Sequence, residues 1–185
     1  MVKHQKKATG LLGGSFDPAH KGHLEISKIA IKKINLHKIL WLVAKKNPFK
    51  GTPFYSLSQR LTKAKKLAEN NKKIQVKYLD KVAGSSRSID LIMYIINKKK
   101  LKNIYFIIGS DNLIKFHKWK SWKKIVKLTQ LIVFSRKGYD KKSKKSIVAK
   151  YLKNKIIFIN NNPISISSTK IRRQVKKNIN GNSKN

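Results

Sequence analysis

The alternation of short apolar segments with amphipathic ones is the feature that most limits how this chain can fold. Apolar runs with the length of strands lie at residues 9–14, 38–44, 73–79, 103–109, 130–135 and 155–160. Segments with helical spacing of apolar residues lie at 23–36, 56–70, 88–99, 121–129, around 143–153 and at 167–177. A strand, a helix and another strand form a crossover unit whose strands run parallel. The sequence therefore predicts an α/β protein with a Rossmann-like, doubly wound parallel sheet and helices on both faces.

Length and composition limit the remaining possibilities. The chain has 185 residues, about one domain's worth, and 40% of them are hydrophobic. We expect a single domain over residues 1–185 with an ordered core at about 8–177. Cysteine is absent, which excludes disulfides, a thiol nucleophile and cysteine-bound metals. No apolar run has the length of a membrane span, so we expect a soluble, cytoplasmic protein without a membrane partner. The sequence predicts no particular oligomeric state.

The net charge of +38 raises the question of a nucleic-acid partner, because basic surfaces bind phosphates. However, 40 of the basic residues are Lys and only 5 are Arg, and the Lys residues are spread along the whole chain. A nucleic-acid site is expected to use Arg for bidentate contacts. Lys, Ile and Asn, all frequent here, are the residues of AT-rich codons. We interpret the charge as codon drift, and a specific nucleic-acid partner is the weaker hypothesis.

The stretch "GGSFDPAHKGH", residues 13–23, joins the first predicted strand to the first predicted helix. Gly13 and Gly14 allow a tight turn whose amide groups can bind an anion, and the helix turns its positive end to the same place. His20 and His23 lie one turn apart at the helix start. The stretch is neither a Walker loop nor a dinucleotide fingerprint, and a third ligand for zinc is lacking. It predicts a phosphate site; the alternative is a glycine turn with two surface histidines.

Further polar motifs follow the other predicted strands and the last predicted helix start. "NPFK", "SSRSID", "GSD" and "SRKG" come after the second to fifth strands, so they are expected on one rim of the sheet, where ligands bind in such folds. Ser167, Ser168 and Thr169 form a hydroxyl-rich helix start that is a second candidate phosphate site. The alternative for each of these three residues is a simple helix cap.

Together, these motifs resemble those of a known superfamily. "GGSFDPAHKGH" is similar to the HxGH signature of the nucleotidyltransferases, and "ISSTKIR" at 166–172 is similar to their second signature. "NPFK", "FIIGSDN" with a Trp eight residues past its Asp, and "FSRKGYD" resemble the bacterial nicotinate-nucleotide adenylyltransferases. The resemblance spans roughly residues 8–177. It is broken at "SSRSID", where that family usually has a Tyr-Thr pair and this chain has Arg87 and Ser88.

The resemblance implies a sheet of the nucleotidyltransferase type and a reaction. The enzyme would transfer the adenylyl group of ATP to nicotinate mononucleotide, giving deamido-NAD and pyrophosphate in NAD biosynthesis. The attacking phosphate is already ionised, so positioning and charge neutralisation can supply the catalysis. Mg²⁺ would be carried by the ATP phosphates, because the sequence shows no acidic cage and no metal-binding residues.

The resemblance also assigns roles to individual residues. His20, His23 and Arg172 would be catalytic. ATP would be bound by Gly13, Gly14, Ser15, Phe16, Arg136, Ser167, Ser168 and Thr169. The mononucleotide would be bound by Asn47, Lys50, Arg87, Ser88, Asp111 and Trp119, with Trp119 stacking on the nicotinate ring and Asp111 holding ribose hydroxyls.

Structural alternatives accompany some of these roles. Asp111 could instead be a helix cap. Trp122 is expected in the core, Arg60 could be a helix-surface residue, and His37 and His117 are expected to have no role in the site.

Two other functions compete with this prediction. Phosphopantetheine adenylyltransferase shares both end motifs, but the "FIIGSD…W…SRKG" block argues against it. A non-catalytic basic nucleic-acid-binding protein could use the same fold, but the two histidines and "SSTKIR" argue against that. We also expect the acid, nicotinate mononucleotide, to be preferred over its amide.

Overall fold

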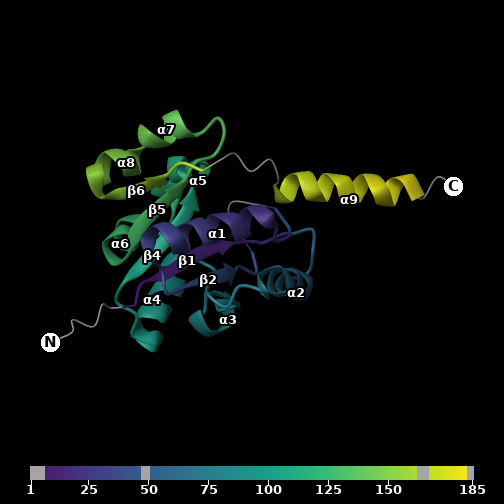
Figure 1. The fold of residues 1–185 in the computed structure, drawn as a ribbon, viewed down its shortest axis with the longest axis horizontal. Coiled ribbons are helices and arrows are strands. Elements are labelled where there is room, and N and C mark those ends of the chain that lie inside the picture. The colour runs from purple at the N-terminus through teal and green to yellow at the C-terminus, as the bar shows by residue number, and fades with distance from the viewer. Residues whose placement is uncertain (1–6, 47–50, 162–166, 183–185) are drawn as a thin grey trace.

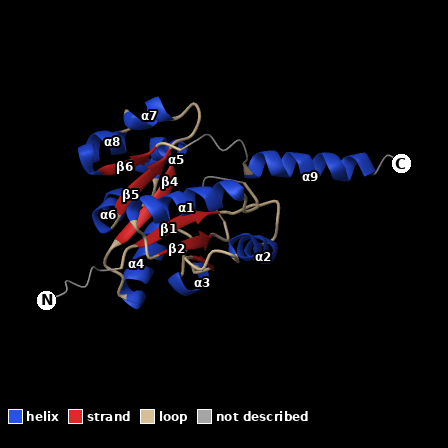
Figure 2. Ribbon diagram, viewed as in Figure 1, coloured by secondary structure: helices blue, strands red, loops and turns tan. Residues whose placement is uncertain are grey.

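The protein is built on a parallel six-stranded sheet (Figures 1 and 2). The computed structural model describes residues 7–46, 51–161 and 167–182. The strands are β1 (Thr9–Gly14), β2 (Lys38–Val43), β3 (Ile74–Lys77), β4 (Ile104–Gly109), β5 (Gln130–Phe134) and β6 (Ile156–Ile159). Their order is β3-β2-β1-β4-β5-β6, and every pair of neighbours is parallel. The predicted doubly wound α/β fold is confirmed, with all six strands within two residues of the predicted positions.

Helices and helical turns connect the strands. They are α1 (Lys21–Ile34), α2 (Leu57–Ala68), α3 (Asp80–Ala83), α4 (Ser88–Lys99), α5 (Ser110–Lys115), η1 (Phe116–Lys118), α6 (Trp122–Leu128), α7 (Asp140–Lys144), α8 (Ile147–Leu152), η2 (Lys153–Lys155) and α9 (Ser168–Asn182). The helix expected around 143–153 is two short helices, because Ser146 caps a new one by accepting a hydrogen bond from the Ala149 amide. The last helix continues past its expected end at residue 177.

Apolar side chains of the strands point alternately to the two faces of the sheet, which is the period-2 pattern of strands. Leu11 packs in a core with α4, α5, α6 and α8, whereas its neighbour Leu12 packs in a second core with α1 and α2. Helices therefore cover both faces, as predicted. Helix α9 projects from this body and carries the C-terminus (Figure 1). Among the helices in the described part of the chain, none has the length and apolar character that a membrane crossing requires.

The strand order places a switch point between β1 and β4, which pair directly although β2 and β3 come between them in sequence. Helices that leave β1 and β4 pack on opposite faces of the sheet, so the chain diverges there. Ligands of doubly wound folds bind at such a point, beyond the carboxyl ends of the strands. The fold thus locates the site near Gly14 and Gly109, where these two strands end.

Candidate active site

Two neighbouring cavities open at the switch point, with volumes of about 730 and 320 Å³. They share the wall formed by Gly13, Gly14 and Trp119. Every predicted site residue in the described segments lines one or both cavities. The larger cavity is lined by Gly13, Gly14, Ser15, Phe16, His20, His23, Asp111, Trp119, Arg136, Ser167, Ser168, Thr169 and Arg172. The smaller cavity is lined by Gly13, Gly14, Arg87, Ser88 and Trp119. Asn47 and Lys50 lie outside the described residues.

His20 and His23 begin α1 as a reciprocal capping pair. His20 is the N-cap, and its Nδ1 accepts a hydrogen bond of 3.1 Å from the Gly22 amide. The His23 Nδ1 accepts one of 3.3 Å from the His20 amide. Ser, Thr, Asp and Asn normally make such caps. Histidine is not among the usual capping residues, so the sequence pattern predicted a helix start at His23, two residues after the observed start at Lys21.

This capping pair determines which nitrogen of each ring can donate. A neutral imidazole whose Nδ1 accepts a hydrogen bond carries its proton on Nε2. The hydrogen bonds therefore assign an Nε2–H donor to both rings, and both residues line the larger cavity. Burial, and secondarily the positive charge of Arg136, lowers the pKa of His20 to about 4. His20 is therefore a neutral donor at physiological pH.

Aromatic packing holds the two histidine rings in place. The ring centroids of His20 and His23 are 4.0 Å apart, and the His23 ring lies 4.7 Å from Phe16. Phe16 is buried against Trp41, with a φ of 47°, an uncommon value for a residue with a side chain. Trp41 Nε1 donates to the Ser27 hydroxyl, which donates to the His23 carbonyl. Packing therefore holds the two imidazole rings, and with them their N–H donors, in fixed positions, as preorganised catalysis requires.

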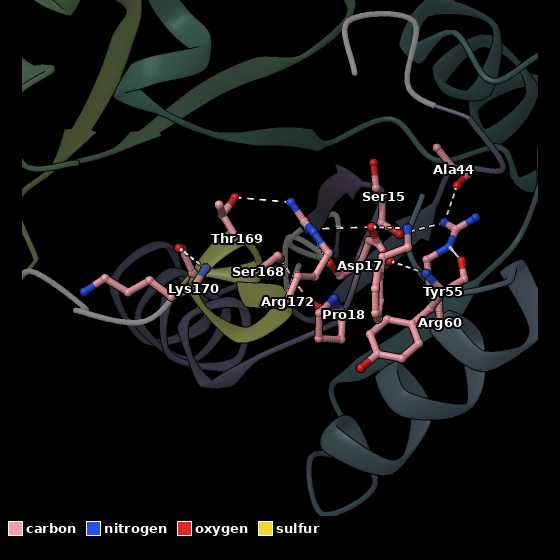
Figure 3. A network of polar contacts seen from close by, with 12 residues as sticks. Ser15, Asp17, Pro18, Ala44, Tyr55, Arg60, Ser168, Thr169, Lys170 and Arg172 are labelled. Atoms are coloured by element: carbon pink, nitrogen blue, oxygen red, sulfur yellow. Dashed lines mark hydrogen bonds and ion pairs between the residues drawn. The ribbon is translucent and has the colours of Figure 1, made fainter. Parts of the chain in front are cut away.

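Asp17 joins the loop after β1 to two distant segments (Figure 3). Its carboxylate accepts hydrogen bonds of 2.9 Å from the Phe54 and Tyr55 amides, just before α2. Arg172 of α9 donates to the Asp17 carbonyl at 2.5 Å and lies 3.6 Å from its carboxylate. The Ser168 hydroxyl donates to the Pro18 carbonyl at 3.0 Å. These contacts bring the start of α9 beside the histidines, although 150 residues separate Ser168 from Pro18.

Asp111 and Arg136 form an ion pair at the ends of β4 and β5, with 2.7 Å between Arg136 Nη1 and Asp111 Oδ2. The N-cap of α5 is Gly109, so the alternative interpretation of Asp111 as a helix cap is wrong. A Cβ on Gly109 would lie 2.5 Å from Asp111 Oδ1, which explains the glycine. The Arg136 amide donates to the Ser110 hydroxyl and to Asp140. Arg136 is thus fixed by Ser110 and Asp140, and its ion pair holds the Asp111 carboxylate at the rim of the larger cavity.

The smaller cavity combines an aromatic wall with positive charge. Trp119 packs on Phe116 and Phe106 at centroid distances of 4.9 and 6.2 Å, so its indole is anchored in the core. Lys46, Arg87, Lys118 and Lys120 are the cationic residues of the lining, which contains no acid among the described residues. Such a cavity suits a flat aromatic anion. The three lysines were not predicted, because nothing distinguishes them from the other lysines of this chain.

The structure also decides the predictions for residues outside the site. Trp122 packs against the core and meets the Tyr151 ring edge-on at 5.1 Å, as expected of a core residue. His37 and His117 line neither cavity. The alternative that places Arg60 on the helix surface is wrong: its side chain is 1% exposed.

The donor set of the site does not form a cage for a metal ion. No group of three or more His, Asp or Glu side chains in the described segments is placed to bind one. The two acids of the larger cavity are already engaged, Asp17 by two amides and Asp111 by Arg136. Mg²⁺ favours phosphate oxygens and water over all-protein cages, so this chemistry fits an ion that arrives on a nucleotide.

Comparisons with known proteins agree with this geometry. The family model described as cytidylyltransferase-like matches residues 11–174. A curated protein of Pelagibacter ubique (strain HTCC1062), named "Probable nicotinate-nucleotide adenylyltransferase", is 48% identical over 173 residues, which are 93% of this chain and 96% of that protein.

Solved structures show the same fold. The nicotinic acid mononucleotide adenylyltransferase of Plasmodium falciparum, complexed with NaAD, superposes with a TM-score of 0.71 at 22% identity, over 90% of this chain and 83% of that chain. The same enzyme complexed with APC gives a TM-score of 0.70 over the same shares.

Proposed function

The chain belongs to the cytidylyltransferase-like family and, within it, to the nicotinate-nucleotide adenylyltransferases; from this membership we propose how its two cavities carry out the reaction. The enzyme transfers the adenylyl group of ATP to nicotinate mononucleotide in NAD biosynthesis. A phosphate oxygen of the mononucleotide forms a bond to the α-phosphorus of ATP. The bond from that phosphorus to the bridging oxygen breaks, and pyrophosphate leaves with the electron pair.

The observation that carries the proposal is the wall shared by the two cavities. ATP occupies the larger cavity and the mononucleotide the smaller one, so the α-phosphorus and the attacking phosphate meet at Gly13 and Gly14. No protein base is needed, because the nucleophile is an anion. The site gains rate by holding two anions in line and by placing donors where charge accumulates.

His20 and His23 donate to the oxygens of the reacting α-phosphate. The capping pair fixes both rings and leaves their Nε2 atoms to donate, so little reorganisation is required during the reaction. The amides at Ser15 and Phe16 and the start of α1 add positive dipoles in the same place. A neutral His20 is suited to donate repeatedly without titrating near pH 7.

The triphosphate lies against the start of α9. Ser167, Ser168 and Thr169 offer hydroxyls there, and Arg172 and Arg136 supply positive charge to the β and γ phosphates and the departing pyrophosphate. Helix α9 has 15 residues, so its N-terminal dipole adds to this field. Mg²⁺ carried by the phosphates would neutralise further charge.

The mononucleotide enters the smaller cavity with its pyridine ring on Trp119. Arg87, Lys118 and Lys120 surround it with positive potential, which favours the carboxylate of nicotinate over the neutral amide. Ser88 adds a hydroxyl at the position where the family has Thr. The ribose of the mononucleotide reaches past Trp119, which both cavities share, to the larger cavity, where Asp111 accepts from the ribose hydroxyls. Roles for Asn47 and Lys50 remain predictions from the sequence, as does the cytoplasmic location.

Pyrophosphate release from ATP, measured with three acceptors, tests this proposal. Nicotinate mononucleotide should support turnover, with a kcat/KM one to two decades above that for nicotinamide mononucleotide. The NH₂ of the amide cannot accept from a donor of the site that pairs with the carboxylate, and leaving one buried donor unpaired costs about 1–3 kcal/mol. Phosphopantetheine should support none. Equal use of acid and amide would refute the assignment of the cationic cavity, and turnover with phosphopantetheine alone would refute the function.

A further inference from the structure

Arg60 is a buried arginine that lines neither substrate cavity. It lies on α2, and its guanidinium donates four hydrogen bonds to main-chain carbonyls. Figure 3 shows Arg60 with three of its partners, Ser15, Ala44 and Tyr55. Nη1 donates to Ser15 and Ala44 at 2.7 Å each, Nη2 donates to Lys45 at 3.0 Å, and Nε donates to Tyr55 at 3.1 Å. One side chain thus binds the main chain of three separate segments.

The arrangement is specific to a guanidinium. Burying a charge is costly unless its donors are satisfied, and Arg presents five N–H donors in a rigid fork. Burial lowers the pKa of Arg60, while the negative charges of Asp17 and Asp80 oppose that change. A lysine could not reach four carbonyls from one point. In a chain where Lys supplies 40 of the basic residues, an arginine here meets a geometric requirement.

The four carbonyls belong to the segments that form the site. Ser15 follows β1 and lines the larger cavity. Ala44 follows β2 and lines the smaller cavity. A single Nη1 atom binds both of them, which ties the wall of one cavity to the wall of the other. The Ala44 amide also donates to the Gly14 carbonyl at 2.9 Å, so the two loops are joined next to the wall that both cavities share.

Two buried acids extend this framework. Asp17 accepts from the Phe54 and Tyr55 amides, in the segment that also provides a carbonyl to Arg60. Asp80 accepts from the Lys45 amide at 2.7 Å and from the Ser86 hydroxyl. Ser86 lines the smaller cavity beside Arg87 and Ser88. The loops after β1, β2 and β3 are therefore all bound, directly or through one acid, to the Arg60 framework.

We propose that Arg60 is a positioning residue for adenylyl transfer, which holds the ATP subsite and the mononucleotide subsite at the separation that in-line attack requires. The inference rests on the proposed function. Each substrate on its own can bind to its own cavity without a fixed distance between the two cavities. The chemical step needs both, so an error in their spacing lowers kcat rather than the affinity for either substrate.

The test compares Arg60→Lys with Arg173→Lys, which makes the same chemical change at an exposed position of α9 outside both cavities. A misplacement of about 1 Å costs on the order of 10²-fold in rate, so we expect Arg60→Lys to lower kcat about 10- to 100-fold. Calorimetric Kd values for nicotinate mononucleotide alone and for a non-hydrolysable ATP analogue alone should match the wild type. Arg173→Lys should retain full kcat.

Each outcome separates the inference from the proposed function. Turnover by the wild type and Arg173→Lys reports on the proposed function, whereas only the Arg60 variant reports on positioning. A folded Arg60→Lys with wild-type kcat would overturn the inference. So would Kd values that weaken as much as kcat falls, because that result means general disruption of the loops.

A second variant covers the case in which Arg60→Lys does not fold. Arg60→Ala leaves space for a guanidinium ion, which can offer donors to the same carbonyls. Guanidinium at a non-denaturing concentration should then raise the kcat of Arg60→Ala, while an equal concentration of sodium ion should not. Absence of this rescue in protein that unfolding curves show to be native would overturn the inference.

Discussion

The double use of His20, as helix cap and as phosphate donor, allows its two roles to be separated by one substitution. His20→Asn keeps a good N-cap, because an Asn oxygen accepts from the first amides of a helix as readily as any side chain. It removes the imidazole Nε2–H from the larger cavity. We therefore expect kcat to fall while the free energy of unfolding stays nearly constant.

The magnitudes follow from the contacts. The Gly22-to-His20 bond is a single N-cap contact, so losing it in His20→Ala should cost about 1 kcal/mol, whereas His20→Asn should cost only a few tenths. Loss of one preorganised donor lowers kcat on the order of 10²- to 10³-fold. Both variants should therefore show the same large loss of kcat and different stabilities. His23→Gln is the matching variant at the third helical position, where Gln completes a capping box.

The assay combines pyrophosphate release at saturating substrates with urea unfolding of the same preparations. If His20→Asn retained near-normal turnover, the donor role would be refuted. If His20→Asn were as destabilised as His20→Ala, the interpretation of His20 as a side-chain cap would fail. A loss of kcat that merely tracked the loss of stability across the variants would contradict the separation of the two roles.

Further predictions concern pH, surface charge and two other site residues. The pKa of His20 is about 4 when folded and 6.5 when unfolded, so its contribution to stability is present above pH 6.5 and is lost as the pH falls toward 4; in urea titrations the wild type should therefore lose stability relative to His20→Asn, whose side chain does not titrate, over that range. Reversing the exposed lysines of 141–146 should leave kcat/KM for the mononucleotide within a few-fold, since exposed charges are screened beyond about 8 Å at physiological salt, and a large loss would place that segment at the site. Gly109→Ala should displace the Asp111 carboxylate and raise the KM for the mononucleotide at little cost in stability; an unchanged KM would remove Asp111 from the site. Arg87→Ala should erase much of the preference for the acid, and an undiminished preference would assign it to the lysines or main chain instead.

Strands and most helices could be predicted because their signals are local. An apolar run or a 3.6-residue period reflects burial of one segment against the rest, whatever the rest is. The site loops could be placed for a similar reason: parallel strands end at one edge, so loops after them must converge. The start of α1 at Lys21 was missed by two residues because its N-cap, His20, is an unusual capping residue.

Contacts between distant segments were the part that local patterns could not supply. Asp17 and Phe54 are 37 residues apart, and no local sequence pattern in either segment predicts the hydrogen bond between them. A signal for Arg60 did exist. It lies four residues before Ala64, which lies four before Ala68, and both alanines are buried, so the helical period already placed Arg60 on the inner face of α2. A surface interpretation of Arg60 ignored that period.

Adenylyl transfer differs from other reactions of ATP in which phosphorus is transferred, the α-phosphorus. ATP labelled with ³²P at the α position should pass its label into a dinucleotide that co-migrates with deamido-NAD, in amounts equal to the pyrophosphate released. ATP labelled at the γ position should give label in pyrophosphate only. Transfer of the γ label to the mononucleotide, or release of pyrophosphate without a labelled dinucleotide, would contradict adenylyl transfer at this site.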